Sequence, residues 1–248
     1  MASDIRMITF VFPAYNEAEN LKRFPTEVIP VFDALEEPYE VVVVDDGSVD
    51  DTADVASSLG GRVRLVRHDR NRGLGASVRT GIREARGDLI VTMDTDLTFA
   101  PSLVPSLLER YRKGDVDCVS GSPKLAGYDR KIPFYRKAIS YAATAVYAVV
   151  IGAWVRDVSP IFRLYRREQL LELPLETERF EINAEILFHL IRRGRRVVEI
   201  PASLTQRIHG ESKLDYRKEI VRHLKLVSRM IRMRLFPRRT LAKDRVSA

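Results

Sequence analysis

The chain has 248 residues, of which 45% are hydrophobic and 30% charged, a composition typical of a soluble globular protein long enough for a full core. Its single cysteine, Cys118, excludes an internal disulfide and any cysteine metal cluster, and it is compatible with a reducing cytosol. The formal net charge of +7 is concentrated in residues 213–248, which hold twelve Lys or Arg against three Asp or Glu, so the rest of the chain is slightly acidic.

The first part of the chain alternates short apolar runs with amphipathic stretches, a pattern typical of βαβ units and a parallel sheet. We expect strands at 7–12, 39–44, 63–66 and 88–93, and helices at about 17–35, at 51–59 and from 75 to 85. The predicted fold class is therefore α/β: a single Rossmann-like domain with a central, mostly parallel sheet.

Acidic residues follow three of these predicted strands. Glu17 comes after the first, Asp45 and Asp46 end the second, and Asp94 and Asp96 follow the fourth. Ligands of open α/β sheets bind beyond the carboxyl ends of the strands. We therefore expect these acids to converge on one crevice.

Asp94 and Asp96 are the most informative pair, although a short Asp-x-Asp segment also occurs in loops by chance. In an extended chain residues i and i+2 point the same way, so both carboxylates would face one target. Two neighbouring negative charges favour a cation between them, and hard oxygen ligands suit Mg²⁺ or Mn²⁺. The pair therefore predicts a metal site.

The second part of the chain is less regular. We expect strands at 116–121, 161–166 and 197–200, and a helix at 181–193. Residues 138–155 carry no formal charge but are marginal for a membrane span of roughly 20 residues, so we interpret them as a partly buried or interfacial helix. With no internal repeat or linker in view, the simplest division is one domain over 1–212 and a tail over 213–248.

The tail predicts a basic amphipathic helix. Apolar residues recur at helical spacing at Ile220, Leu224, Val227, Ile231 and Leu235. Basic residues recur on nearly the opposite face at Lys218, Arg222, Lys225, Arg229 and Arg232. Such a helix can lie on an anionic bilayer, where each basic group contributes about 1 kcal/mol. Alternatively it docks on the domain and leaves a solvated basic face, and both arrangements can hold at once.

Four segments in order resemble the inverting family-2 glycosyltransferases of the GT-A fold. They are 13–17 (PAYNE), 43–48 (VVDDGS) with Asp50, 71–75 (NRGLG) and 93–96 (MDTD). Downstream, 157–163 (DVSPIFR), Glu181 with Glu185, and 207–213 (RIHGESK) are similar to segments of dolichyl-phosphate mannose synthases and related polyprenyl-phosphate glycosyltransferases. The resemblance covers about residues 7–213.

The resemblance implies roles for individual residues. The base and ribose of a nucleotide sugar would be held by Pro13, Tyr15, Glu17, Val43 and Asp45. The metal–pyrophosphate motif would be Asp94, Thr95 and Asp96, with Mg²⁺ or Mn²⁺ on the two carboxylates. Arg207 and Lys213 would grip phosphate groups of donor or acceptor, and with Asp94 and Asp96 they form the expected catalytic set.

The implied activity is inverting, metal-dependent transfer of a hexose to a polyprenyl or dolichyl monophosphate, with mannose from GDP-mannose as the favoured donor. UDP-glucose or another donor, and a soluble or polysaccharide acceptor, remain alternatives. We expect the protein on the cytoplasmic face of a membrane, since no signal-peptide pattern precedes Met7. The sequence leaves open a membrane-embedded partner subunit.

Three positions depart from the family pattern. Relatives have an arginine where Pro123 follows Gly-Ser, and Lys124 or Arg130 are the candidates to replace it. Ile161 stands in place of a glycine and Thr98 in place of a glutamine. These changes lie near the expected donor-phosphate and sugar pockets and leave the sugar open.

Three other classes of protein are disfavoured. A dinucleotide-binding oxidoreductase would need a glycine where Val78 follows Gly73 and Gly75. A nucleotidyltransferase would need a glycine-rich phosphate loop after the first strand. Nucleic-acid binding is not expected, because the body of the chain is acidic and shows no binding motif. The four histidines, His68 among them, show no metal-ligand spacing, and Trp154 is interpreted as a packing or interfacial residue.

Overall fold

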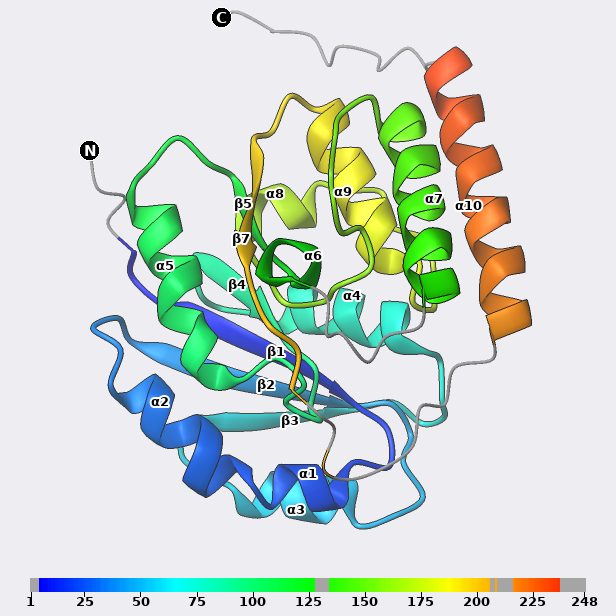
Figure 1. The fold of residues 1–248 in the computed structure, drawn as a ribbon. Coiled ribbons are helices and arrows are strands. Elements are labelled where there is room, and N and C mark those ends of the chain that lie inside the picture. Colours follow the sequence, from blue (N-terminus) through cyan, green and yellow to red (C-terminus); the bar gives the residue numbers. More distant parts are fainter. Residues whose placement is uncertain (1–4, 128–133, 206–207, 209–215, 237–248) are drawn as a thin grey trace, which may run out of the picture.

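The computed structural model describes residues 5–127, 134–205, 208 and 216–236, and it confirms the predicted α/β domain with a mostly parallel sheet. Within this part of the chain seven strands form one sheet in the order β3-β2-β1-β4-β6-β5-β7 (Figure 1). Their bounds are β1 Ile8–Ala14, β2 Tyr39–Asp45, β3 Val63–Arg67, β4 Leu89–Thr92, β5 Cys118–Ser122, β6 Arg163–Arg166 and β7 Val197–Pro201. Strand β6 runs antiparallel to both of its neighbours, and the other pairs are parallel.

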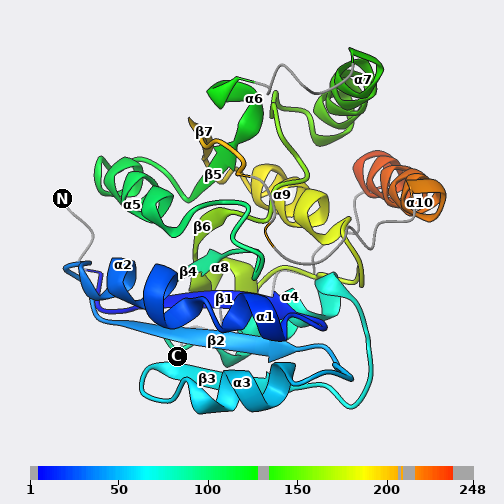
Figure 2. The same cartoon turned by 60° about the horizontal axis from the view of Figure 1, so that its bottom comes forward.

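Helices cover both faces of the sheet (Figure 2). They are α1 Ala18–Leu21, the π-helix η1 Phe24–Val28, α2 Ile29–Asp33, α3 Thr52–Ser58, α4 Leu74–Glu84, the 3-10 helix η2 Pro101–Leu103, α5 Val104–Arg112, α6 Pro123–Ala126, α7 Phe134–Ile151, α8 Arg167–Leu171, α9 Ile182–Arg192 and α10 Tyr216–Leu235. Elements α1, η1, α2, α3 and α5 share one core cluster with the sheet, and α4, α8 and α9 share the cluster on the other face.

The central strands β1, β2 and β4 are mainly apolar because they are buried on both faces of the sheet. In β1, Phe10 and Phe12 pack into the first cluster and Val11 packs into the second. The same alternation places Val91 of β4 in the first cluster and Ile90 in the second. The continuous apolar runs of the sequence therefore reflect two-sided burial.

Several boundaries differ from the sequence prediction. The expected helix over 17–35 is divided into α1, η1 and α2, and prolines lie at the start of both η1 and α2. Proline removes a backbone donor and clashes with the preceding turn, which interrupts a regular helix. Helices α5, α6 and α8 were not expected. Cys118 is buried, and burial raises the pKa of its thiol to about 12.

Helices α7 and α10 lie side by side at one end of the molecule (Figure 1). They share a third cluster in which Leu226 and Met230 of α10 pack near Tyr147 and Ile151 of α7. The Tyr147 hydroxyl lies 2.5 Å from Nδ1 of His223. No helix among the described residues is long and apolar enough to span a membrane.

Of the apolar stripe predicted from the sequence, only Val227 packs against the third cluster. Leu226 and Met230 are buried, whereas four members of that stripe are exposed: Ile220 at 58%, Leu224 at 62%, Ile231 at 43% and Leu235 at 67%. The helix is therefore docked on the domain and still presents an apolar stripe outward.

Gly81 lets α4 approach the sheet closely, because a Cβ atom there would lie 2.2 Å from Cγ1 of Val11. Replacing a glycine inside a helix by alanine ordinarily adds about 1 kcal/mol of stability. Here we expect Gly81→Ala to lower the free energy of unfolding by about 1–3 kcal/mol, because the extra methyl overpacks the core.

Denaturant unfolding of Gly81→Ala and of Arg83→Ala, an exposed change on the same helix, would check this. The Arg83 variant should stay within about 0.5 kcal/mol of the unmodified protein. A stabilised Gly81→Ala variant would contradict the contact.

Candidate active site

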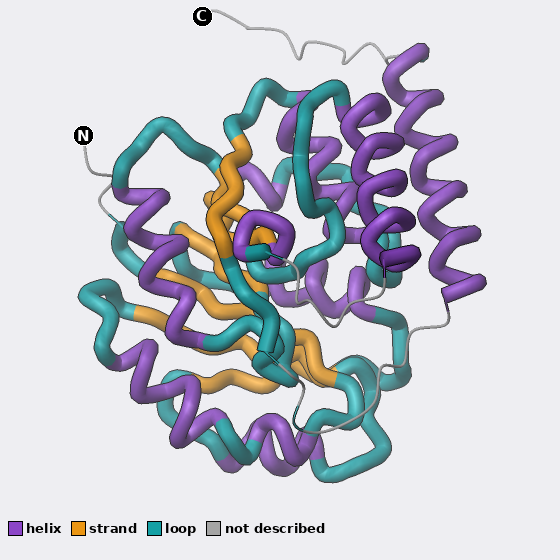
Figure 3. Tube along the Cα trace, in the orientation of Figure 1, coloured by secondary structure: helices purple, strands orange, loops and turns teal. Residues whose placement is uncertain are grey.

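The predicted acidic segments lie at one edge of the sheet. Strands β2 and β4 both pair in parallel with β1, in a register that sets Asp45 opposite Ala14 and Thr92 opposite Val11. The three carboxyl ends therefore point to the same edge, beyond which loops gather (Figure 3). The segments that follow them, 15–17, 46–48 and 93–96, share this edge, as the sequence predicted.

Asp94 and Asp96 lie in a turn after β4 and not in an extended strand, because β4 ends at Thr92. Strand alternation, which was expected to point both carboxylates the same way, therefore does not apply to Asp94 and Asp96. Thr95 anchors the turn by donating from Oγ1 to the Pro13 carbonyl at 2.8 Å. The Asp96 carboxylate accepts from the Thr98 amide at 2.9 Å and is nearly buried, and Asp94 is half-buried.

A second contact holds this turn from the other side. Arg23, at the junction between α1 and η1, donates from Nη1 to the Asp96 carbonyl at 3.3 Å. Its guanidinium also forms an ion pair with Glu27 at 2.8 Å. Contacts to β1 and to the α1–η1 junction thus fix the backbone of the acidic turn, which leaves the carboxylates in a defined place.

Asp45 organises the turn after β2. Its wholly buried carboxylate accepts from the Ser48 amide at 2.9 Å and lies 3.1 Å from Nε of Arg67. Ser48 in turn accepts from the Asn16 amide at 2.9 Å, so the turns after β1 and β2 are joined. The carboxylate that was expected to hold a nucleotide is therefore engaged within the protein.

Asp46 fixes the glycine-containing segment before α4. Its carboxylate accepts from the amides of Arg72 at 2.9 Å and Gly73 at 2.7 Å, and it is hydrogen-bonded to Nδ1 of His68 at 2.7 Å. Nε2 of His68 lies 3.0 Å from Oγ1 of Thr80 on α4. His68 is thus a buried structural residue, and no local spacing in the sequence indicated its partner.

The other predicted binding residues differ in how deeply they are buried, and two of them are not described by the structure. Pro13, Tyr15 and Glu17 are half-buried at the end of β1, and the Glu17 amide donates to Oγ1 of Thr52 at 2.8 Å. Val43 is wholly buried in the first core cluster, so its side chain would act on a nucleotide only by shaping the sheet. Arg207 and Lys213 lie outside the described residues.

Lys124 is engaged in structural contacts. Its ammonium donates to Oγ1 of Thr144 on α7 at 2.5 Å and to the Arg156 carbonyl at 2.7 Å, and it lies 3.4 Å from the Asp157 carboxylate. Burial lowers the pKa of this ammonium. In this arrangement Lys124 connects α6 to α7, which differs from its expected phosphate contact. The alternative candidate, residue 130, lies outside the described residues.

Ile161, at the position where the resemblance led us to expect a glycine, is buried in the second core cluster. Its carbonyl accepts from Oγ1 of Thr92 at 2.5 Å, at the end of β4. The isoleucine therefore contributes to packing behind the strand that leads to the acidic turn.

The acidic turn has the chemistry that a hard divalent cation requires. Asp94 and Asp96 supply carboxylate oxygens, and among the described residues no group of three or more His, Cys, Asp or Glu forms a closed metal cage. Mg²⁺ is commonly bound through one or two carboxylates, with substrate phosphates and water completing its coordination. The residues present fit that mode of binding.

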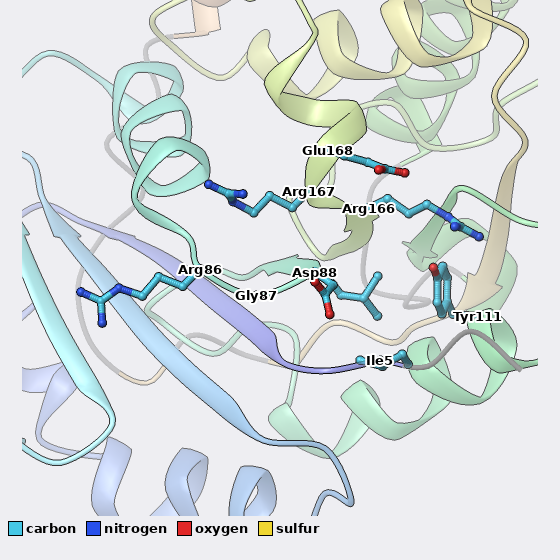
Figure 4. Close-up of a pocket in the computed structure, with 9 residues that line it drawn as sticks. Ile5, Arg86, Gly87, Asp88, Tyr111, Arg166, Arg167 and Glu168 are labelled. Carbon is cyan, nitrogen blue, oxygen red and sulfur yellow. The ribbon is translucent and has the colours of Figure 1, made fainter.

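A separate hollow lies at the opposite edge of the sheet, beside Asp88 at the start of β4 (Figure 4). Arg86, Arg166 and Arg167 line it, but their side chains diverge, and the Arg166 guanidinium lies 5.4 Å from the Tyr111 ring centre. The diverging cations and the acidic Asp88 do not form a convergent anion site, so this hollow is not the candidate active site.

Comparisons with known proteins agree with the fold and the motifs. Residues 9–173 match the family described as "Glycosyl transferase family 2". The chain is 33% identical over 232 residues to a dolichol-phosphate mannosyltransferase of Pyrococcus furiosus, which covers 91% of this chain and 64% of that protein. It is 32% identical over 221 residues to an undecaprenyl-phosphate mannosyltransferase of Micrococcus luteus, which covers 85% of this chain and 88% of that protein.

A third relative, an undecaprenyl-phosphate 4-deoxy-4-formamido-L-arabinose transferase of Edwardsiella ictaluri, is 30% identical over 220 residues and covers 87% of this chain and 65% of its own length. The chain thus spans just under two thirds of the Pyrococcus and Edwardsiella proteins. Among solved structures, glucosyl-3-phosphoglycerate synthase from Mycobacterium tuberculosis, in complex with Mn²⁺, UDP and glucosyl-3-phosphoglycerate, has a TM-score of 0.68 at 19% identity and covers 92% of this chain and 80% of its own.

The structural likeness confirms the expected GT-A fold. The family match includes all four of the segments on which the resemblance was based, from the turn after β1 to the acidic turn after β4. The chain belongs to glycosyl transferase family 2.

Proposed function

We propose that this protein transfers a hexose from a nucleotide sugar to a polyprenyl monophosphate, with inversion and with a divalent cation at Asp94 and Asp96. Mannose from GDP-mannose is the favoured donor. One observation carries the proposal: the acidic turn after β4 lies at the same sheet edge as the turns after β1 and β2, in a chain whose relatives include dolichol-phosphate and undecaprenyl-phosphate mannosyltransferases.

The charge requirements of the reaction agree with this site. Breaking the anomeric bond leaves negative charge on the departing nucleoside diphosphate, and a bound cation would neutralise part of it. Thr95 and Arg23 hold the backbone between and around the two carboxylates, so the turn does not have to reorganise during the reaction. Arg207 and Lys213 are proposed to grip phosphate groups near this edge.

The acceptor would supply its own nucleophile. A phosphate monoester has a second pKa of about 6, so a polyprenyl monophosphate is already largely dianionic at pH 7. We therefore propose that no side chain acts as an essential base on the acceptor. What the protein must supply is position: the phosphate oxygen has to lie on the face of the sugar opposite the leaving group.

Access to a lipid acceptor is proposed to come from α10 and α7. The exposed stripe Ile220, Leu224, Ile231 and Leu235 lies on α10 beside the exposed basic residues Lys225 and Arg232. On the neighbouring α7, Val149 is 74% exposed, and Trp154 just beyond it is 66% exposed. Apolar and cationic groups together favour the surface of an anionic bilayer.

We further propose that the protein works at the cytoplasmic face of a membrane, where the nucleotide sugar is available. A membrane-embedded partner subunit stays a prediction. The competing function is transfer to a soluble or polysaccharide acceptor, for which the exposed stripe on α10 would have no role.

Incubation of the purified protein with Mg²⁺ or Mn²⁺, polyprenyl phosphate and a panel of radiolabelled GDP- and UDP-sugars tests the activity. We expect label from GDP-mannose in the lipid fraction, and a β-linked product, because a single displacement inverts the anomeric centre of an α-linked donor. Label that enters only water-soluble acceptors would favour the competing function.

Asp94→Asn should lower the transfer rate by at least about a hundredfold at limiting Mn²⁺, because it removes one charged ligand from the acidic turn. Asp88→Asn is the matched control, since Asp88 is exposed at the opposite end of the same strand. Titration of the rate with Mn²⁺, together with Mn²⁺ binding by electron paramagnetic resonance, would measure the effect. Equal rates and equal Mn²⁺ affinities for the two variants would contradict the proposed metal site.

Leu224→Glu with Ile231→Glu should reduce sedimentation with anionic phosphatidylserine vesicles by at least about tenfold, because each apolar side chain contributes roughly 1.5–3 kcal/mol when it leaves water. Leu171→Glu, which changes a leucine that is 44% exposed on α8, should have little effect. Failure of the unmodified protein to bind vesicles even at low salt would refute the membrane role of α10.

A further inference from the structure

Arg229 of α10 points into the protein, although the sequence assigned it to a solvated basic face. Its side chain is 30% exposed, and its guanidinium forms ion pairs with Glu185 of α9 and, at 2.6 Å, with Glu176 in the preceding loop. Glu185 is 1% exposed and Glu176 is 70% exposed. The pair with Glu185 is therefore the shielded one, in which solvent screens little of the attraction.

Glu185 uses its other contacts to hold the loop before α9. Its carboxylate accepts from the Thr177 amide at 2.9 Å, from Oγ1 of Thr177 at 2.6 Å and from the Glu176 amide at 3.1 Å. The same buried carboxylate thus binds α10 on one side and the backbone at 176–177 on the other. Its negative charge is offset by Arg229, which makes the two sets of contacts mutually dependent.

The loop at 177–179 packs against the glycine-containing turn at 71–75, just before α4 and at its first residues. The Glu178 carbonyl accepts from the Gly75 amide at 2.8 Å and from the Ala76 amide at 3.3 Å. A Cβ atom on Gly73 would lie 2.3 Å from that carbonyl, so only glycine allows the approach. Arg179 donates to the Asn71 side chain at 2.9 Å. The loop therefore contacts the 71–75 turn at both of its ends.

The far side of this glycine turn is bound to the candidate active site. The Gly73 amide donates to the Asp46 carboxylate at 2.7 Å, and Asp46 directly follows Asp45 at the end of β2. An unbroken series of packed polar contacts therefore runs from Arg229 on the outer helix to the edge where the nucleotide sugar is proposed to bind.

We propose that Arg229 is a positioning residue for donor binding: through Glu185 and the 176–179 loop it holds the 71–75 turn in place, so that the docking of α10 and the affinity for the nucleotide sugar are linked. This inference rests on the proposed function. Such a link appears as a change in binding at one end when the other end is altered.

Arg229→Met removes the charge and keeps most of the side-chain length. We expect it to raise the dissociation constant for a GDP–Mn²⁺ probe, and the KM for the donor, by a factor between about 2 and 30, the range typical of residues that couple two sites. The rate at saturating donor should change less, because the acidic turn after β4 is untouched. Arg229→Lys, which retains the charge, should recover part of the affinity.

Lys225→Met is the matched control, because it removes the same charge from an exposed position on the same helix. A vesicle-binding defect common to both variants would report on the membrane role of α10. Calorimetry in detergent without vesicles reports on donor binding alone, so failure of the membrane proposal and failure of the coupling are distinguishable. Thr177→Val, which removes one contact from the loop without exposing a buried charge, should weaken probe binding in the same direction.

Hydrogen exchange measured by nuclear magnetic resonance gives a readout that does not require ligand. In Arg229→Met the amides of Gly75 and Ala76, which donate to Glu178, should exchange faster, whereas the Gly73 amide, held by Asp46, should keep its protection. In Lys225→Met all three should be unchanged. If the unmodified protein binds no nucleotide, this exchange pattern still tests whether Arg229 holds the 71–75 turn in place, separately from the proposed function.

Unchanged GDP–Mn²⁺ affinity in both Arg229→Met and Thr177→Val, with intact protection at Gly75 and Ala76, would overturn the proposal. So would equal losses in Arg229→Met and Lys225→Met, which would show that only the charge of α10 matters.

Discussion

Parallel pairing of β1 with β2 and β4 is the constraint on which the site depends. Backbone hydrogen bonds set Ala14 opposite Asp45 and Val11 opposite Thr92, so three chain segments far apart in sequence leave the sheet at one edge. Burial on both faces holds that pairing, since Phe10 and Phe12 pack on one side and Val11 on the other. Whatever binds at this edge is positioned by the core.

Buried carboxylates then shape the loops beyond that edge. Asp45 accepts from the Ser48 amide, Asp46 from the Gly73 amide and Asp96 from the Thr98 amide. A hydrogen bond to a charged group contributes about 1.5–3 kcal/mol and leaves a large penalty if it is broken, so each acid holds its turn firmly. Acidic residues at this edge therefore serve both as candidate ligands and as supports for the backbone that presents them.

Helix α10 docks on the domain and also keeps an apolar stripe exposed. Leu226 and Met230 dock it on the domain, while Leu224 and Ile231 remain exposed on another face. Arg229 contributes to docking because the buried Glu185 requires a counter-charge. A helix held in this way can meet a bilayer without losing its place on the catalytic domain, which is what transfer to a lipid phosphate would require.

The sequence by itself determined the strands, the order of the acidic segments and the family. Strands buried on both faces need apolar residues at successive positions, and each motif is a short continuous segment, so both can be recognised without the tertiary structure. It did not predict α5, the antiparallel direction of β6, the turn geometry at Asp94 or the docking face of α10. The partners of His68 and Arg229 also came only from the tertiary structure: they lie 22 and 44 residues away, and a single contact at such a separation leaves no periodic signal. Periodicity shows that α10 has an apolar and a basic face, whereas the neighbours it meets decide which of its residues are buried.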